Sequence, residues 1–338
     1  MSRGDRAQGL ILAADDDGIA RAIEVLRAGQ AVAFPTETVY GLGADAASAA
    51  GVAEIYRIKR RPRDHPLIVH IADADALGFW AQFDERARLL VAAFWPGPLT
   101  LVMRRRADAP AHACAGHPTI GLRCPSHPVA RRLLAAFAGM GGQGIAAPSA
   151  NRFGMVSPTR AEHVLADLDG DVPLILDGGD AEIGLESTIV DLSGERARLL
   201  RPGAIAGSAL AEVLGEPIGG AGSTAPRVPG SLAAHYAPGT PIELVDAQEL
   251  AGRVASLREQ GMRLAVWSRE PCLANAVEWL AAPSDPQAYG RMLYDGLRRL
   301  DRLGVDRLLI EAVPAGEAWD AVRDRLGRAA TGAGMRSD

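Results

Sequence analysis

The sequence predicts an α/β protein with two domains. Short apolar runs alternate with amphipathic helical patterns along the chain, which is typical of sheets covered by helices. The 338 residues are enough for about two domains, each with its own core. Composition changes between residues 215 and 238, where Gly, Pro, Ser and Ala dominate. We therefore predict a first domain over 1–214, a linker or lid over 215–238 and a second domain over 239–338.

The first domain is expected to begin with a strand at Leu10–Ala13, followed by a helix that Asp15 caps and Gly29 ends. Short apolar runs indicate further strands, and apolar residues at helical spacing indicate further helices. The expected strands lie at 31–34, 67–71, 99–103, 119–123, 144–147, 174–177 and 187–192, and the expected helices at 85–94, 128–138, 160–168 and 205–214.

The second domain shows a regular alternation of the two patterns. Strands are expected at 242–245, 263–267 and 305–311, and helices at 248–260, 287–303 and 319–330. This alternation predicts a small parallel sheet in a three-layer α/β arrangement. Because this half carries no glycine-rich fingerprint and no cluster of catalytic residue types, we expect it to serve support or recognition.

Charge and cysteine content exclude several classes of protein. The net charge of −5 argues against a protein that mainly coats nucleic acid. The cysteines Cys114, Cys124 and Cys272 form no Cys-x-x-Cys pair, which favours a reducing cytosol. The N-terminus shows no basic-then-apolar signal, and the apolar runs are too short to cross a bilayer. We therefore expect a cytoplasmic protein without a membrane segment.

Lys59 is the only lysine among the 36 Lys and Arg residues of the chain. A compact, strongly hydrated ammonium and a planar guanidinium are not interchangeable at a phosphate or a reacting group. The helical pattern that starts after Ser48 is expected to end at Pro62, and a buried strand is expected from Leu67. The sequence therefore places a cluster of positive charges, Arg57 to Arg63, at a helix-to-strand corner that could face an anion.

Two loops rich in hydroxyls and glycines are further candidates. Residues 35–43 follow a buried strand, and Thr36 and Thr38 in this loop can donate to carboxylate or phosphate oxygens. Residues 148–159 form a strand-to-helix connection, and its hydroxyls suit an oxyanion or a phosphate. Arg123, at the end of an expected strand, could clamp a carboxylate with both of its terminal nitrogens. A plain turn would also explain the loop at 35–43, and a lone arginine such as Arg123 is more often part of a surface ion pair.

Several common motifs are absent or misleading. The single lysine does not follow glycines, so there is no Walker-type loop. Gly41-x-Gly43-x-x-Ala46 imitates a dinucleotide fingerprint, but it does not open a helix directly after a strand. The set His112, Cys114, His117 and Cys124 matches no usual zinc spacing. Cations and hydroxyls spread over several strand ends instead indicate a nucleotide site outside the P-loop class.

Eight segments, in order, resemble the threonylcarbamoyl-AMP synthase family in its longer form, with a YrdC-type domain and a C-terminal domain. The resemblance spans essentially the whole chain. It is carried by FPTETVYGLG at 34–43, Lys59-x-Arg61-Pro62 with 66–70, WPGPLT at 95–100, 120–123, 148–151 with 157–159, ESTIVD at 186–191, 201–203 and HYAP at 235–238.

The resemblance implies that L-threonine, bicarbonate (or CO2) and ATP form L-threonylcarbamoyl-adenylate and pyrophosphate. ATP is then a substrate, with Mg²⁺ as an expected companion. The product would pass to proteins that make t6A at tRNA position 37, and tRNA itself is a further expected partner. The implied fold is an open, twisted-sheet catalytic domain with a large concave face, plus a smaller Rossmann-like domain.

The resemblance also implies roles for individual residues. The catalytic set falls on Lys59, Arg61, Ser149 and Asn151, and no protein ligand to a metal is implied. The threonine site falls on Thr36, His70, Arg123, Ala147 and Ser187, and the ATP site on Lys59, Arg63, Thr119, Ser149, Ser157, Arg201 and Tyr236, the last closing from the linker.

Two alternatives remain at this point. A related class of enzyme makes carbamoyl-adenylate from carbamoyl phosphate, but its cysteine-rich zinc repeats and acylphosphatase module are not present here. An RNA-binding translation factor could use the basic concave face as a cradle for RNA. The acidic net charge and the lack of aromatic residues interleaved with the basic clusters weigh against it.

Overall fold

The computed structural model describes residues 10–168, 170–222, 225–271 and 278–334. Cys272, one of the three cysteines, lies outside these residues. The chain separates into two compact units, each described by itself below. Unit 1 comprises residues up to 153 and residues 157–231, and unit 2 comprises residues 154–156 and 232 onward. Residues 215–231, within the stretch expected to be a linker or lid, therefore belong to unit 1.

Unit 1 is built on one mixed sheet, whose main path runs β1-β9-β2-β3-β8-β4-β7-β6-β10-β11-β12, with β5 paired to β6. The sheet contains parallel pairs, such as β4 with β7, and antiparallel pairs, such as β7 with β6. The strands are β1 (Leu10–Ala13), β2 (Val32–Phe34), β3 (Gly41–Asp45), β4 (Ile68–His70), β5 (Ala81–Gln82), β6 (Leu99–Arg105), β7 (Thr119–Arg123), β8 (Ile145–Ala146), β9 (Leu174–Asp177), β10 (Thr188–Asp191), β11 (Arg198–Arg201) and β12 (Gly219–Gly220).

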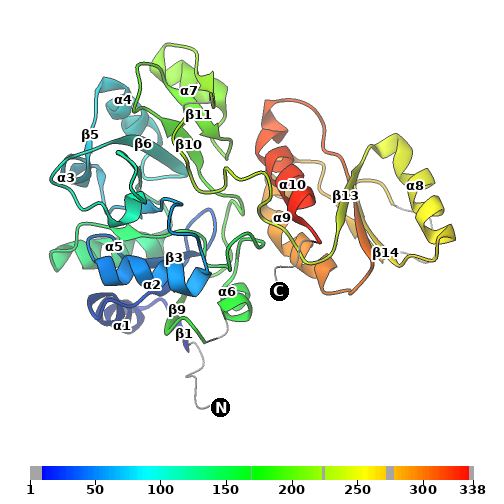
Figure 1. The fold of residues 1–338 in the computed structure, drawn as a ribbon, viewed down its shortest axis with the longest axis horizontal. Helices are drawn as coiled ribbons and strands as arrows, with labels where there is room; N and C mark the ends of the chain where they lie inside the picture. The colour runs from blue at the N-terminus through cyan, green and yellow to red at the C-terminus, as the bar shows by residue number, and fades with distance from the viewer. Residues whose placement is uncertain (1–9, 169, 223–224, 272–277, 335–338) are drawn as a thin grey trace. The chain divides into compact units, whose positions relative to one another are not determined.

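Two helices of unit 1 begin at the capping residues that the sequence indicates. The Asp15 carboxylate accepts from the backbone N–H of Gly18, and Ser48 caps the next helix through Gly51 in the same way. Figure 1 shows α1 beside α5, and the two helices pack together. The helices are α1 (Asp16–Arg27), α2 (Ala49–Lys59), α3 (Leu77–Trp80), α4 (Glu85–Phe94), α5 (Pro128–Gly139), α6 (Ala161–Leu168) and α7 (Gly207–Leu214).

The prediction that residues 35–43 form only a loop is wrong at its end. Gly41–Asp45 is strand β3, which pairs antiparallel with β2 and with β8. A β-carbon at Gly43 would lie 2.6 Å from the Phe34 ring and from Ile145, so close packing requires glycine here. The pattern that suggested a dinucleotide loop therefore belongs to a strand.

The end of helix α2 also differs from the expectation. The helix stops at Lys59 rather than at Pro62, because Arg60 takes the left-handed conformation that caps it (φ 50°). The backbone N–H of Arg61 then bonds to the carbonyl of Tyr56. Lys59 is consequently the last helical residue, and the next basic residues lie on an irregular turn.

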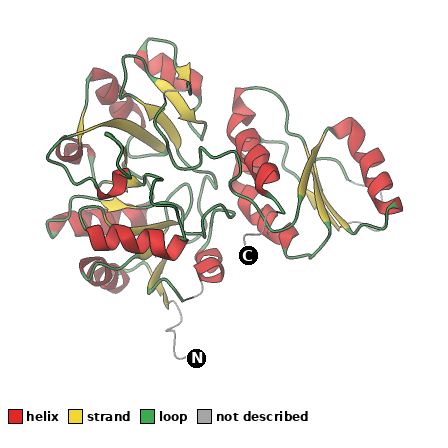
Figure 2. Ribbon diagram, in the orientation of Figure 1, coloured by secondary structure: helices red, strands yellow, loops and turns green. Residues whose placement is uncertain are grey.

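Unit 2 is a three-layer α/β unit, as predicted. Its sheet is wholly parallel, in the order β13-β16-β14-β15. Helix α8 packs on the sheet, and Figures 1 and 2 show α9 and α10 on the opposite face. The elements are β13 (Ile242–Val245), α8 (Ala247–Glu259), β14 (Leu264–Ser268), β15 (Glu278–Ala281), α9 (Pro286–Asp301), β16 (Arg307–Glu311) and α10 (Asp320–Gly332).

Strand β15 is the one element of this sheet that the sequence did not predict. It lies at the edge of the sheet, where only Leu280 of its residues is buried and Trp279 is exposed. An edge strand of this kind lacks the apolar run that marks a buried strand. No helix among the described residues is both long and apolar enough to cross a membrane.

Candidate active site

Lys59 lies at the end of α2, and its ammonium is fixed by two backbone carbonyls. The Nζ atom donates to the carbonyl of Ser149 and to that of Asn151, both at 2.5 Å. The side chain is 2% exposed, and burial and the neighbouring Arg61 hold the pKa of Lys59 well below its usual range. An ammonium has three donors, so one N–H remains available to a ligand. A bound polyanion would stabilise the charged form that burial disfavours.

Ser149 and Asn151 therefore contact Lys59 through their backbone carbonyls and not through their side chains. Ser149 forms a bridge with Gly41, and the amide nitrogen of Asn151 donates to the Arg152 carbonyl at 2.7 Å. The N–H of Phe153 bonds to the carbonyl of Lys59. These bonds hold residues 149–153 against the end of α2, which gives Lys59 a single position.

Arg61 is buried beside this lysine on the same turn. Its Nη2 atom donates to the Pro66 carbonyl at 3.0 Å, and its guanidinium lies over the Phe153 ring, 5.4 Å from the centroid. Arg63 is exposed. Two buried cations thus lie together at the turn, and a third lies on its surface.

A second cluster surrounds Arg123 at the end of β7. Its Nη2 atom forms an ion pair of 2.7 Å with the Glu37 carboxylate, and its Nη1 atom donates to the Thr38 hydroxyl at 2.8 Å. The hydroxyls of Thr36 and Thr38 are 2.8 Å apart. All four side chains are almost completely buried. Two partners hold the guanidinium plane in one orientation, as recognition of a carboxylate requires.

His70 is the direct neighbour of Arg123 across β4 and β7. Burial and the positive charge of Arg123 lower the pKa of His70 to about 3. No hydrogen-bond partner for its Nδ1 atom is found among the described residues. Burial alone would raise the pKa of Glu37, but the Arg123 charge and hydrogen bond lower it overall. At neutral pH the cluster therefore contains a carboxylate, a guanidinium and a neutral imidazole.

A third cluster lies where β6, β10 and β11 meet. The Arg201 guanidinium donates to the Ser187 carbonyl at 3.0 and 2.9 Å and to the Pro229 carbonyl at 2.9 Å. The Ser187 hydroxyl accepts from Arg201 at 3.1 Å and lies 2.7 Å from the hydroxyl of Thr100. Thr119 and Thr100 line a cavity of about 20 Å³ that also borders Pro229. Arg201, like Lys59, is thus anchored by carbonyls.

The sheet brings most of the predicted residues together. Strands β8, β4, β7, β6, β10 and β11 are successive neighbours, and all of them except β6 carry a predicted residue or adjoin one in sequence. Ala147 joins the group because its N–H bonds to the Ile68 carbonyl at 2.9 Å. The Ser157 hydroxyl donates to Glu186, the residue before Ser187, at 2.6 Å.

Tyr236 is the one predicted residue outside unit 1. In unit 2 its ring packs on His235 and Tyr294, with the Arg325 guanidinium 5.4 Å from its centroid. Its backbone has a positive φ of 61°. A contact between Tyr236 and ATP stays a prediction.

Three buried polar residues of these clusters were not among the predicted site residues: Glu37, Thr100 and Glu186. Each lies inside a segment that carried the family resemblance. Glu37 could have been noticed, because a carboxylate in a buried segment requires a cationic partner. Among the described residues, no group of three or more His, Cys, Asp and Glu side chains is placed to hold a metal ion.

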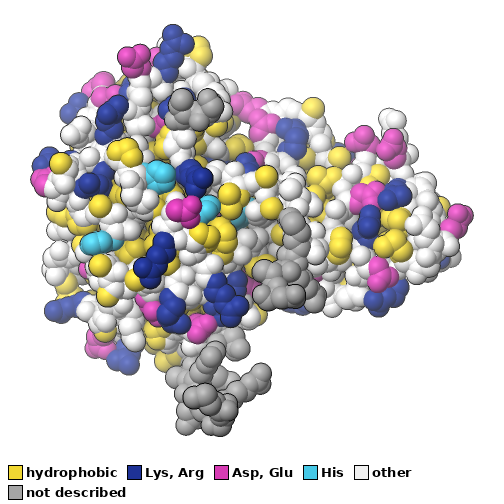
Figure 3. Space-filling model, in the orientation of Figure 1, with side chains coloured by type: hydrophobic (Ala, Val, Ile, Leu, Met, Phe, Trp, Pro, Cys, Tyr) yellow, Lys and Arg dark blue, Asp and Glu magenta, His cyan; other side chains and the backbone are white. Residues whose placement is uncertain are grey.

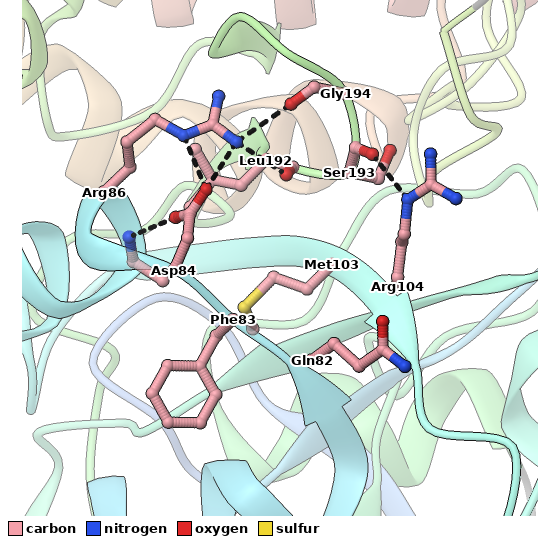
Figure 4. A pocket seen from close by; sticks show the side chains of 10 residues that line it. Gln82, Phe83, Asp84, Arg86, Met103, Arg104, Leu192, Ser193 and Gly194 are labelled. Atoms are coloured by element: carbon pink, nitrogen blue, oxygen red, sulfur yellow. Dashed lines mark hydrogen bonds and ion pairs between the residues drawn. The ribbon is translucent and has the colours of Figure 1, made fainter.

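The larger pocket in Figure 4, of about 260 Å³, is a different place on unit 1. Arg86 on its wall donates to Asp84 at 2.9 and 2.7 Å and to the carbonyl of Gly194 at 2.9 Å. Arg104 donates to the Ser193 carbonyl at 3.0 Å. None of the predicted site residues lines this pocket, and protein groups already engage Arg86. The three clusters above are therefore the better candidate for the site.

The fold and these clusters define a class of protein, a two-unit α/β protein with a cationic site unlike a P-loop. Two family models match nearly the whole chain. The Sua5, YciO and YrdC model, described as "Telomere recombination", matches residues 24–203. The model described as "Threonylcarbamoyl-AMP synthase, C-terminal domain" matches residues 205–331. The chain belongs to the threonylcarbamoyl-AMP synthase family.

Individual relatives are similar over almost their full length. The threonylcarbamoyl-AMP synthase of Bacillus subtilis is 38% identical over 337 residues, 96% of either chain. That of Pyrococcus abyssi is 37% identical over 316 residues, 90% of this chain and 91% of the relative. A crystal structure of P. abyssi Sua5 complexed with L-threonine matches with a TM-score of 0.87 and 35% identity, over 96% of this chain and 97% of the other.

These findings confirm the family and the two-part α/β fold predicted from the sequence. They support the synthase interpretation and not the RNA-binding alternative. On the face of unit 1 visible in Figure 3, basic, acidic and hydrophobic side chains are interspersed.

Proposed function

We propose that this chain is an L-threonylcarbamoyladenylate synthase, which forms its product and pyrophosphate from L-threonine, bicarbonate and ATP. The observation that carries the proposal is the arrangement around Lys59 in a member of this family. A buried ammonium is fixed by two carbonyls and keeps one donor, beside a second buried cation, Arg61. Such a group suits phosphate oxygens, which accept hydrogen bonds and carry negative charge.

The reaction joins two anions. The threonine amine forms a carbamate with CO2, releasing a proton, or with bicarbonate, releasing water. A carbamate oxygen then attacks the α-phosphorus of ATP. The bond from the α-phosphorus to the bridging oxygen breaks, and pyrophosphate leaves with its electron pair. Because both reactants are negative, Lys59, Arg61, Arg63 and Arg201 must offset phosphate charge and hold the groups in line. None of these side chains has to form a covalent intermediate.

The threonine end is assigned to the cluster around Arg123. The guanidinium would bind the threonine carboxylate, held in place by Glu37 and Thr38. Thr36 and the neutral His70 would face the amine and hydroxyl of the substrate. A neutral imidazole suits this position, because a second full positive charge would repel an ammonium.

Water has to be excluded, since carbamates and acyl-adenylates hydrolyse. Closure of the site is assigned to the segment 215–238, with Tyr236 near its end. The carbonyl of Pro229 in this segment accepts from Arg201, so the segment already contacts one of the proposed ATP residues within unit 1.

Mg²⁺ is proposed to enter as part of the substrate MgATP. The described residues provide no group of carboxylates and imidazoles to hold an ion by themselves. Magnesium is commonly bound through one or two carboxylates together with substrate phosphates and retained waters. When bound, the ion would offset phosphate charge alongside the cations of the chain.

The product is proposed to feed t6A formation at position 37 of tRNA, through transferase proteins that accept the adenylate. This work would take place in the cytoplasm, where ATP and tRNA are found. Cys114 and Cys124 are buried free thiols, each with a pKa raised to about 11 by burial, which fits a reducing compartment.

The test is pyrophosphate release from ATP by the full chain, with threonine and bicarbonate added together and each omitted in turn. The proposal expects release only when both are present, with mass spectrometry detecting threonylcarbamoyl-adenylate. Pyrophosphate release that is independent of threonine, or a product without the carbamoyl group, would contradict it.

A further inference from the structure

Two buried side chains in unit 1, Ser157 and Glu186, form a hydrogen bond in which only Ser157 can be the donor. The Oγ atom of Ser157 lies 2.6 Å from Oε1 of Glu186, and the residues are 0% and 7% exposed. Ser157 precedes helix α6, and Glu186 precedes β10. The contact therefore joins two segments of the proposed ATP site that are distant in the chain.

An ionised carboxylate has no proton to donate, so Ser157 must be the donor in this bond. Its single hydroxyl proton is then directed at Glu186. Toward any ligand, the Ser157 oxygen can only accept. Phosphate oxygens at neutral pH also only accept. A phosphate is thus a poor partner for Ser157, although the sequence alone favoured an oxyanion in this loop.

We propose that the Ser157–Glu186 pair recognises a hydrogen-bond donor on the nucleoside part of ATP, either the adenine amine or a ribose hydroxyl. This inference rests on the proposed function and specifies which end of the nucleotide the pair contacts. It makes Glu186 a positioning residue that acts through Ser157.

The surroundings of the pair agree with assigning the phosphates to the cations and the nucleoside to Ser157. Ser187 follows Glu186 directly, and its carbonyl holds the Arg201 guanidinium. Lys59 and Arg61 provide further donors, which contact residues 149, 151 and 153. Cationic donors for phosphates are therefore close by, and an acceptor such as Ser157 is needed only for a group that carries a proton.

The experiment measures dissociation constants of the full chain by calorimetry, for ATP, 2′-deoxyATP and inosine triphosphate. Inosine has a carbonyl where adenine has its amine, so the two analogues separate the two possible donors. Ser157→Ala and Glu186→Gln are compared with wild type, and Ser268→Ala, a buried serine of unit 2, is the matched control.

We expect wild type to bind one analogue roughly tenfold more weakly than ATP, as expected for one lost hydrogen bond in a buried setting. Ser157→Ala should raise the dissociation constant for ATP by a similar factor. The dissociation constant for that analogue should stay within about twofold of its wild-type value. The glutamine amide of Glu186→Gln can itself donate to Ser157, which frees the hydroxyl proton and should shrink or reverse the preference. Ser268→Ala should bind all three nucleotides as wild type does.

The inference is overturned if both variants weaken the binding of all three nucleotides and of inorganic tripolyphosphate by one common factor. That result would show that Ser157 contacts a phosphate. It is also overturned if neither variant changes any constant. Because binding is measured without turnover, these outcomes are separate from the threonine-dependent release that tests the proposed function. Normal ATP binding without that release would contradict the function and leave the recognition of the nucleoside intact.

Discussion

The cations of the proposed site in unit 1 and the arginines of unit 2 are stabilised in different ways. In unit 1, Lys59 and Arg201 donate to backbone carbonyls of Ser149, Asn151, Ser187 and Pro229, which carry no net charge. In unit 2, arginines pair with carboxylates. Glu311 accepts from the backbone N–H and the guanidinium of Arg269, Glu243 from Arg253 and Arg307, and Asp324 from Arg325 and Arg328.

The difference shows what each unit can do with its positive charge. A carbonyl orients a cation without cancelling it, so unit 1 presents net positive charge in a buried setting, at a cost in desolvation. A carboxylate cancels the charge, so such a pair presents little net charge to a ligand. The Arg123–Glu37 pair of unit 1 is also an arginine paired with a carboxylate. Such a pair suits the recognition of threonine, a zwitterion that has to be oriented but carries no net charge.

The largest effect that would sharpen this comparison is expected from Lys59→Arg. At this buried position the wider, planar guanidinium would displace the two carbonyl contacts and the donor that is aimed at phosphate. We expect kcat for threonine-dependent pyrophosphate release to fall on the order of 10²–10³-fold. Circular dichroism should show the fold retained.

The matched control is Arg253→Lys in unit 2, where a carboxylate partner tolerates either cation. Its activity should stay within about twofold of wild type, as for surface substitutions generally. Near-normal turnover by Lys59→Arg would remove the special role of this lysine and break the comparison.

Glu37→Ala should have the next largest effect, because it removes the carboxylate that neutralises the buried guanidinium of Arg123. Removing one partner of a buried ion pair typically costs about 3–5 kcal/mol of unfolding free energy. We expect KM for threonine to rise roughly tenfold or more through misplacement of the guanidinium, and KM for ATP to change little. Steady-state kinetics and urea unfolding provide both measurements.

Glu37→Gln retains an acceptor for Arg123 and should recover part of the threonine affinity. Equal increases in KM for threonine and ATP in Glu37→Ala would instead indicate a general loss of structure.

Arg269→Ala in unit 2 should reduce stability without reducing activity. Glu311 is 5% exposed and now accepts from both the backbone N–H and the guanidinium of Arg269. In the variant only the backbone N–H of residue 269 would remain as a donor. We expect a loss of about 1–3 kcal/mol of unfolding free energy and kcat within about twofold of wild type. A large loss of kcat with normal stability would show that charge pairing in unit 2 serves the reaction directly.

The smallest expected effect concerns pH. His70 has a folded pKa of about 3 against an ordinary value of 6.5, so the unfolded chain binds more protons between these values. Stability that is present above about pH 6.5 is therefore lost as pH falls toward 3. Between pH 7 and 5 wild type should lose about 2 kcal/mol more than His70→Asn, measured by urea unfolding. Equal losses would show that His70 titrates normally in the folded protein.

The sequence predicted most of the fold because buried strands and capped helices have local signals. The Asp15 and Ser48 caps and the alternation in unit 2 are examples. It did not predict β3, because the glycines that suggested a loop are required by contact with Phe34. It did not predict β15, because an edge strand can be mostly exposed.

The site was predicted less completely than the fold. Lys59 could be singled out because it is unique in composition, but the carbonyls that hold it belong to Ser149 and Asn151, about 90 positions away. Glu37 was not predicted, because its partner Arg123 is equally distant in sequence and meets it only when β7 joins the sheet.

The most direct test of the account is a crystal structure of the full chain with threonine and a non-hydrolysable ATP analogue. We predict phosphate oxygens within hydrogen-bond distance of Lys59 Nζ, with its bonds to the Ser149 and Asn151 carbonyls retained. A triphosphate bound instead to the carboxylate-paired arginines of unit 2 would contradict the account.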